Sequence, residues 1–178
     1  MLWLALGILG GLVVLLGLFL LVMYAVGARM EPNHEFSCTL RLRQPAEAVF
    51  AAVDDVAGWP SWDKGVARVE MLPPTDGRET CRMHMGHNPM VLVTTRREPP
   101  RVLERTMEDA GKHRMFSGSW LHEIAPEGAG CVVKLTERGT IHMAIPRAMA
   151  RKLADPRMYL KRHLKVLAAK FGEEARIG

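Results

Sequence analysis

Two polar side chains combine a reactive residue type with a strand position that would place them in an apolar interior. Glu137 alternates in phase with Leu135, and His122 alternates in phase with Trp120, within runs typical of strands. If both point inward, burial shifts their pKa values, and a carboxylate with an imidazole can perform general acid–base work on a carbonyl compound. A single polar anchor for a ligand head group is a second interpretation, and a salt bridge of Glu137 at a strand end is a third. Glu137 and His122 are therefore candidate catalytic residues without being a motif.

The cysteines and the other histidines indicate neither a metal site nor a cofactor. Cys38, Cys81 and Cys131 lie far apart in runs typical of strands, which favours buried free thiols. His84 and His87 have HxxH spacing, but they flank a glycine in a predicted turn with no third ligand nearby in sequence. The sequence contains no glycine-rich phosphate loop and no nucleophile elbow. We therefore expect no metal and no cofactor.

The first 28 residues contain no charged side chain and are rich in Leu, Val and Gly. This run exceeds the roughly 20 apolar residues that cross a bilayer, so it predicts a transmembrane anchor. A secretory signal peptide is the main alternative, because small residues at 25–27 resemble a cleavage site. However, the run is longer than the about 7–15 apolar residues of a signal peptide, and no Lys or Arg precedes it. Arg29 follows directly, so the positive-inside rule favours a single-pass membrane protein with a cytoplasmic soluble domain.

Alternating and apolar runs in the rest of the chain predict an antiparallel sheet. Residues 34–43 alternate apolar and polar side chains, and they are followed by a proline-initiated helix at 45–53 and a helical turn at 54–62. Six further strand-like runs are separated by short turns containing Pro, Gly or Asp, which indicates a meander. These six runs span residues 66–72, 79–85, 90–98, 102–108, 115–124 and 131–141.

Residues 146–171 predict a long amphipathic helix near the end of the chain. Leu160 and Leu164 belong to its apolar stripe, while Asp155-Pro156 should break or kink it before them. From this helix to the last residue, nine Lys or Arg oppose three Asp or Glu, so the segment is the source of the positive net charge. An anionic lipid leaflet is the favoured partner, and the scarcity of interleaved aromatic residues argues against nucleic acid. The predicted membrane-surface cations are Arg151, Lys152, Lys161, Arg162 and Lys165.

A seven-stranded antiparallel sheet with a single long helix has one economical packing. The sheet curls and the helix lies in its concave face, which gives an α+β fold with an apolar interior. Several inward-facing residues are methionines, whose flexible side chains suit a cavity for varied apolar guests and also fill ordinary cores. The predicted cavity residues are Trp59, Trp62, Met83, Met85, Trp120, His122, Leu135, Glu137, Ile141, Met149 and Leu153.

Several short motifs carry a family likeness. Leu42-Arg-Gln-Pro45-Ala-Glu-Ala-Val49-Phe50 and Trp59-Pro60-Ser61-Trp62 resemble the opening of the SRPBCC superfamily, and Phe116-Ser-Gly118-Ser-Trp120 resembles a membrane-anchored bacterial branch of it. These helix-grip proteins include START-like lipid carriers and polyketide cyclase/dehydrase relatives. The resemblance covers residues 36–171 and implies a deep apolar cavity for lipids, sterols, polyketides or other hydrophobic small molecules. It implies no common catalytic motif.

The predicted organisation is a transmembrane anchor (1–28), a juxtamembrane linker (29–35), an SRPBCC-like hydrophobic-ligand-binding domain (36–172) and a tail (173–178). The favoured function is membrane-anchored binding or transport of a lipid-like or polyketide-like molecule in the cavity, with a non-enzymatic role preferred. One alternative is a cyclase or dehydratase-type enzyme that uses Glu137 or His122. Another is an interaction module that docks on a membrane surface or a protein through the basic terminal helix.

Overall fold

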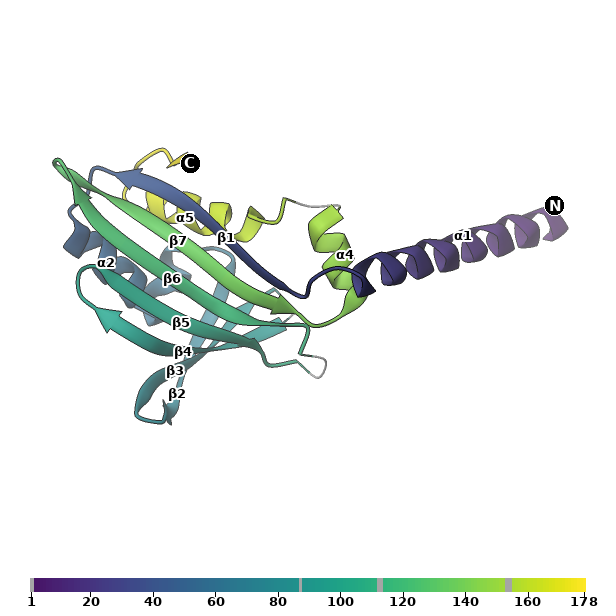
Figure 1. Cartoon of the computed structure of the whole chain (residues 1–178), viewed down its shortest axis with the longest axis horizontal. Helices are drawn as coiled ribbons and strands as arrows, with labels where there is room; N and C mark the ends of the chain where they lie inside the picture. Colours follow the sequence, from purple (N-terminus) through teal and green to yellow (C-terminus); the bar gives the residue numbers. More distant parts are fainter. Residues whose placement is uncertain (1, 87, 112–113, 153–154) are drawn as a thin grey trace.

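The computed structural model describes residues 2–86, 88–111, 114–152 and 155–178 of the chain. Its centre is a curved antiparallel sheet with the strand order β2-β3-β4-β5-β6-β7-β1-β8 (Figure 1). The strands are β1 (Asn33–Leu42), β2 (Val66–Thr75), β3 (Arg78–Met85), β4 (Asn88–Glu98), β5 (Val102–Asp109), β6 (Phe116–Glu127), β7 (Gly130–Ile141) and β8 (Arg176–Ile177). The helices are α1 (Leu2–Ala28), α2 (Ala46–Asp54), the 3-10 turn η1 (Val56–Gly58), α3 (Trp59–Trp62), α4 (Ala144–Lys152) and α5 (Met158–Lys170).

Strand β1 shows how side-chain alternation creates the two faces of the sheet. Cys38, Leu40 and Leu42 are buried, while Ser37 and Arg41 are exposed. Because successive residues of a strand point to opposite faces, one face packs on the core and the other meets solvent. The seven strands predicted from such patterns are confirmed.

An eighth strand, β8, lies outside what the sequence pattern predicts. It pairs antiparallel with β1, so that Ile177 lies opposite Leu40. The Thr39 N–H donates to the carbonyl of Gly178 over 3.1 Å, and the Gly178 N–H donates back to Thr39 over 3.0 Å. The sheet is therefore eight-stranded, not seven-stranded. Two residues are too few to show a periodic pattern, yet they satisfy backbone groups at the outer edge of β1.

Local turn chemistry connects the elements. Asp76 and Gly77 form the turn between β2 and β3 with φ values of 51° and 71°, a left-handed conformation that Asp-Gly adopts readily. Pro45 precedes the first turn of α2, where a missing N–H costs little. The Asp55 side chain accepts a hydrogen bond from the Gly58 N–H at 3.0 Å and so caps the start of η1.

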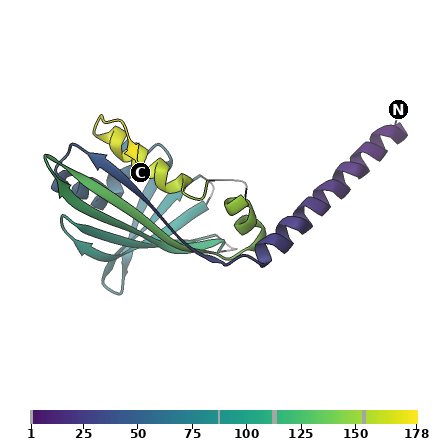
Figure 2. The same ribbon diagram turned by 45° about the horizontal axis from the view of Figure 1, so that its top comes forward.

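The amphipathic segment near the chain end forms two helices instead of one long helix. α4 ends at Lys152 and α5 begins at Met158, so the break falls around Asp155 and Pro156, as predicted. α5 lies across the concave face of the sheet, whereas α4 lies beside the end of α1 (Figure 2). Only α5 therefore acts as the gripped helix.

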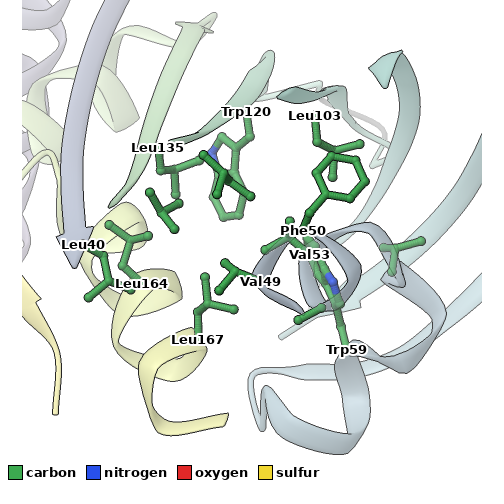
Figure 3. Close-up of a cluster of buried hydrophobic side chains, with 14 of the residues drawn as sticks. Leu40, Val49, Phe50, Val53, Trp59, Leu103, Trp120, Leu135, Leu164 and Leu167 are labelled. Carbon is green, nitrogen blue, oxygen red and sulfur yellow. The ribbon is translucent and has the colours of Figure 1, made fainter. Parts of the chain in front are cut away.

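The core lies between the concave face of the sheet, α5 and α2. Figure 3 shows Leu40 and Leu135 of the sheet facing Leu164 and Leu167 of α5, with Val49 of α2 beside them. All five side chains are buried. Three- and four-residue spacing places the leucines of α5 on one stripe, which is the stripe that the helix buries. This packing confirms the predicted helix-grip arrangement.

Helix α1 extends away from the sheet (Figure 1). Its segment Leu6–Ala28 is long and apolar enough to cross a membrane. Most of its large apolar side chains are exposed, and its main packing partner is α4.

Candidate functional site

A buried carboxylate, Glu137, lies on the concave face where β6, β7 and β1 adjoin. The antiparallel register places Glu137 opposite Trp120 on one side and Phe36 on the other. One carboxylate oxygen accepts a hydrogen bond from Trp120 Nε1–H at 2.7 Å, and the other lies 3.0 Å from His34 Nε2. The Glu137 side chain is only 11% exposed. A carboxylate held in one orientation suits either a general base or a polar anchor.

The position of His34 depends on a glycine in the adjacent strand. A Cβ at Gly139 would lie 2.9 Å from the His34 ring and 2.7 Å from the Phe116 ring, so a larger residue would displace both. His34 stacks on Phe36 with ring centroids 5.1 Å apart. Within the described part of the chain, His34 Nδ1 is buried and has no hydrogen-bond partner. This nitrogen is a polar atom that a ligand can satisfy.

A second polar cluster lies between β6 and α5. His122 Nε2 and His163 Nε2 are 3.4 Å apart, and both residues are buried. The ring centroid of His163 lies 5.2 Å from that of Trp59 and 5.0 Å from that of Trp120. One imidazole can donate N–H to the lone pair of the other, so the pair is satisfied while both rings are neutral.

Burial keeps both histidines in their neutral form at neutral pH. Burial lowers the pKa of His163 to about 4, the nearby Asp63 opposes this shift, and the charges of Arg162 and Arg105 add to it. Burial, followed by charge on His163 and on Arg105, lowers the pKa of His122 well below its ordinary value. These two histidines therefore offer neutral hydrogen-bonding groups.

A small space beside the histidine pair lies in the interior of the helix grip. It holds about 10 Å³ of free volume, far below the roughly 300–1,000 Å³ of ligand pockets. Trp59 Nε1 in its wall is buried and has no hydrogen-bond partner among the residues that the structure describes. In the same wall, Arg162 Nη2 donates to Asp63 Oδ1 over 2.7 Å. The complete lining is Trp59, Asp63, Val66, Met85, Trp120, Tyr159, Arg162 and His163.

A larger groove, of about 550 Å³, lies near the start of β1. Asn33, Glu35 and Arg138 in its lining alternate with the inward residues, so they face outward. Arg138 Nε lies 2.9 Å from Glu35 Oε2, and both side chains are more than half exposed. A groove lined by an exposed ion pair does not suit an apolar molecule, so the interior space is the candidate site.

Comparison with protein families decides the identity of the domain. A family model described as polyketide cyclase / dehydrase and lipid transport matches residues 34–172. The chain belongs to this family. The match runs from β1 through α5 and so contains both buried clusters. A search of curated proteins finds no match.

Several solved structures share the fold of this polyketide cyclase/dehydrase family member. A START superfamily protein from Mycobacterium smegmatis matches with a TM-score of 0.63 at 18% identity, over 77% of this chain and 96% of that chain. Zhui aromatase/cyclase from Streptomyces sp. R1128 matches with a TM-score of 0.63 at 16% identity, over 78% and 93%. A conserved protein from Geobacillus kaustophilus matches with a TM-score of 0.61 at 10% identity, over 81% and 99%. At these identities the likeness concerns the fold alone. The family match is what confirms the resemblance predicted from sequence.

Most of the predicted cavity residues of this START-like domain lie on its concave side. The buried ones are Trp59, Met83, Trp120, His122, Leu135 and Glu137, and the partly buried ones are Trp62, Met85 and Ile141. Glu137 and His122 do not contact each other, because Glu137 bonds to His34 and Trp120 while His122 bonds to His163. The predicted acid–base pair is thus two separate clusters, with the Trp120 ring between them.

Met149 lies outside the interior, which corrects its assignment to the cavity. It is 45% exposed on α4, because α4 turns Arg147 and Ala148 inward and packs beside α1. The assignment assumed that α4 continues the line of α5 along the sheet. Leu153, the other cavity residue predicted in this segment, lies outside the described residues.

The predicted membrane-surface cations do not form one free basic face. Arg162 is bonded to Asp63 in the wall of the interior space. Lys161 Nζ lies 2.6 Å from a carboxylate oxygen of Asp155, and Arg151 Nη2 donates to a backbone carbonyl at 2.6 Å. The two remaining cations, both exposed, are Lys152 and Lys165.

Sequence reasoning missed two histidines of the site although a signal was present. His34 is in phase with Phe36 in β1, and His163 lies three residues after Leu160 on the buried stripe of α5. A polar residue at an apolar phase is the signal that identified Glu137 and His122, and it applies equally here. Asp63 carried no such signal, because its pairing with Arg162 depends on the tertiary fold.

The cysteines give the site no reactive thiol. Cys38, Cys81 and Cys131 are buried and unpaired, as their strand positions predict. Burial raises the pKa of all three thiols, so they stay protonated and weakly nucleophilic. No group of three metal-binding side chains occurs within the described ranges.

Proposed function

We propose that this protein binds a hydrophobic small molecule between the concave face of the sheet and α5, while α1 anchors it in a membrane. The family description and the START-like fold support a ligand-binding role. The observation that carries the proposal is that Trp59 lines the interior space while its indole N–H is buried and has no partner among the described residues.

The polar atoms of this wall favour an apolar ligand with an oxygen acceptor. A carbonyl or hydroxyl oxygen would satisfy Trp59 Nε1–H, which otherwise costs desolvation energy. His163 is neutral at neutral pH, so it supplies no charge to an anionic head group. Arg162 is already bonded to Asp63. A neutral lipid-like or polyketide-like molecule is the class that fits this wall best.

Binding requires part of the wall to move, because the free volume is only about 10 Å³. Tyr159, in the first turn of α5, lines the space and is 58% exposed. The N-cap residue of α5, Arg157, makes no side-chain capping hydrogen bond. The Asp155 side chain accepts a hydrogen bond from the Arg157 N–H at 2.9 Å. We place the entrance at the first turn of α5 because Tyr159 is both exposed and part of the wall there.

Helix α1 has the dimensions of a membrane anchor. The 23 residues of Leu6–Ala28 extend for about 35 Å as a helix, which exceeds the hydrocarbon core of about 30 Å. Arg29 directly after this segment favours a cytoplasmic position for the domain. An anchored domain of this kind meets apolar ligands at the bilayer.

Replacing Met85 with Trp tests the location of the ligand. Met85 lines the interior space, and the larger indole would fill it. We expect retention of apolar molecules to weaken about 5- to 150-fold, from an overpacking cost of about 1–3 kcal/mol. The full chain is purified in a mild detergent, and the bound molecules are extracted with organic solvent and quantified by mass spectrometry.

Met71→Trp is the matched control for this experiment. Met71 lies on the neighbouring strand β2 and is 52% exposed, so its replacement should leave retention unchanged. Equal retention by Met85→Trp and Met71→Trp would show that the ligand does not occupy the space between the sheet and α5.

A further inference from the structure

The end of α1 packs directly on α4. Among the described side chains of α1, the buried ones are Met23 and Gly27, which lie one turn apart on the same face. A Cβ at Gly27 would overlap the carbonyl oxygen of Ala144, so glycine permits this close approach. α4 therefore lies against the last two turns of the apolar segment Leu6–Ala28 (Figure 2).

Arg147 fixes this arrangement through backbone carbonyls. Its buried guanidinium donates to the carbonyl oxygens of Gly27 and Met30, both at 3.0 Å. It also donates to those of Ile141 and His142, at 3.0 and 3.1 Å. Carbonyls at a helix end lack intrahelical partners and carry partial negative charge, so a cation there is favourable. One side chain thus joins the end of α1, the end of β7 and α4.

α4 turns its basic face toward the protein and its apolar face outward, which is the reverse of a helix on the surface of a water-soluble domain. Arg147 and Arg151 turn toward the protein and donate to backbone carbonyls. Met149 lies about 200° around the helix from Arg147 and is exposed, with Ile145 on the same side. Outside α1, the described residues include five large apolar side chains that are exposed. Four of them belong to this part of the chain, namely Met143, Met149, Met158 and Tyr159.

We infer that α4 lies in the interface of the bilayer that α1 crosses, with its apolar outer face against lipid. The inference rests on the proposed anchoring by α1. Because α4 packs on Met23 and Gly27, which are part of the apolar segment, it lies at the depth of the last turns of that segment. Interfacial helices bury their apolar face about 5–10 Å into the headgroup boundary, which matches this depth. Lys152 at the end of α4 is exposed, where an anionic headgroup can neutralise it.

This position turns the entrance of the binding site toward the membrane. Met158 and Tyr159 follow α4 along the chain and are exposed at the start of α5. Tyr159 also lines the interior space. An apolar molecule can then pass between lipid and protein without transfer through water, which would be unfavourable. The partner of this surface is therefore the bilayer itself.

Spin labelling of the full chain measures the depth of α4. The chain is reconstituted in vesicles of phosphatidylcholine and phosphatidylglycerol with a label at Met149→Cys, and the buried natural cysteines are expected not to react. Oxygen concentrates in the bilayer, whereas a nickel chelate stays in water. We expect the ratio of oxygen to nickel collisions to be about fivefold higher at residue 149 than at Met71→Cys, which is exposed on β2.

A third label, at Val14→Cys in the middle of α1, separates this inference from the anchoring. A lipid position at 14 and 149, with an aqueous position at 71, is the expected result. If the label at residue 149 is as accessible to nickel as the label at residue 71, the position inferred for α4 is overturned. The anchoring by α1 is tested separately: it stands if the label at residue 14 lies in lipid, and it is overturned if that label is accessible to nickel. Arg147→Met should lower the oxygen-to-nickel ratio at 149 by about twofold or more. Methionine cannot donate to the backbone carbonyls that Arg147 binds at the end of α1, so α4 would be held less firmly against α1. An unchanged ratio would overturn the role given to Arg147.

Discussion

Replacing Arg105 with Ala is expected to lower the free energy of unfolding by about 3–5 kcal/mol. Arg105 is 3% exposed, and its guanidinium donates to the carbonyls of Val53 and Asp54 at 2.8 and 2.7 Å and to the hydroxyl of Thr94 at 3.1 Å. It also lies 5.7 Å from the ring centroid of Trp59. Its loss leaves the last carbonyls of α2 without their side-chain donor. It also removes the contact of the guanidinium with Trp59, the α3 residue that lines the interior space.

Chemical denaturation of the full chain in mild detergent, followed by tryptophan fluorescence, measures this effect. Arg96→Ala is the matched control on neighbouring strand β4. Arg96 pairs with Glu98 at 2.7 Å, but the two side chains are 50% and 55% exposed, so its loss should lower the stability much less than the loss of Arg105. If Arg105→Ala costs no more than Arg96→Ala, Arg105 does not hold α2 and α3 on the sheet.

Acidification should destabilise the domain through His163. The pKa of His163 falls from its ordinary value of 6.5 to about 4 in the folded state. Between these pH values the unfolded chain binds a proton that the folded chain excludes, so stability rises with pH. This contribution is complete above about pH 6.5 and is lost as the pH falls toward 4, a change of about 3 kcal/mol. The lowered pKa of His122 acts in the same direction.

Stability measured by denaturation at several pH values separates His163 from the other titrating groups. His163→Phe removes the imidazole, so its stability should depend less steeply on pH between 6.5 and 4. His142→Gln is the control for removing an imidazole from an exposed position outside the interior. A His163→Phe slope equal to that of the wild type would mean that His163 takes up its proton at the same pH in the folded domain as in the unfolded chain, which contradicts the lowered pKa.

The strands and the gripped helix follow from local patterns, which is why they could be predicted. Alternation of Phe36, Cys38 and Leu40 is a property of a few consecutive residues, and the leucine stripe of α5 is a property of a single helix. Such patterns state which face of an element is buried. They do not state which other element buries it.

The parts of the site that escaped prediction depend on partners distant in sequence. Arg147 is one of the nine Lys or Arg near the end of the chain, where charge alone predicts an exposed position, yet it is buried because α1 and β7 present carbonyls to it. Met149 was assigned to the interior because its residue type is apolar, yet its helix faces α1 with the opposite side. In both cases the pattern of α4 is amphipathic. Packing against α1 buries the face that carries Arg147 and leaves the face that carries Met149 exposed.

The interior space is the part of the proposal on which the rest depends. Trp59, Trp120 and His163 surround about 10 Å³, and an apolar molecule enters only if the first turn of α5 moves. The same residues would make an ordinary filled core if no ligand were bound. The distinction therefore depends on whether a molecule resides there in the protein as isolated from cells.

Native mass spectrometry of the intact wild-type chain, released gently from detergent micelles, tests this claim most directly. We predict a species heavier than the polypeptide by the mass of one small molecule, which organic extraction removes and Met85→Trp reduces. A folded protein that has the mass of the polypeptide alone, under conditions that preserve non-covalent complexes, would contradict the proposed binding function.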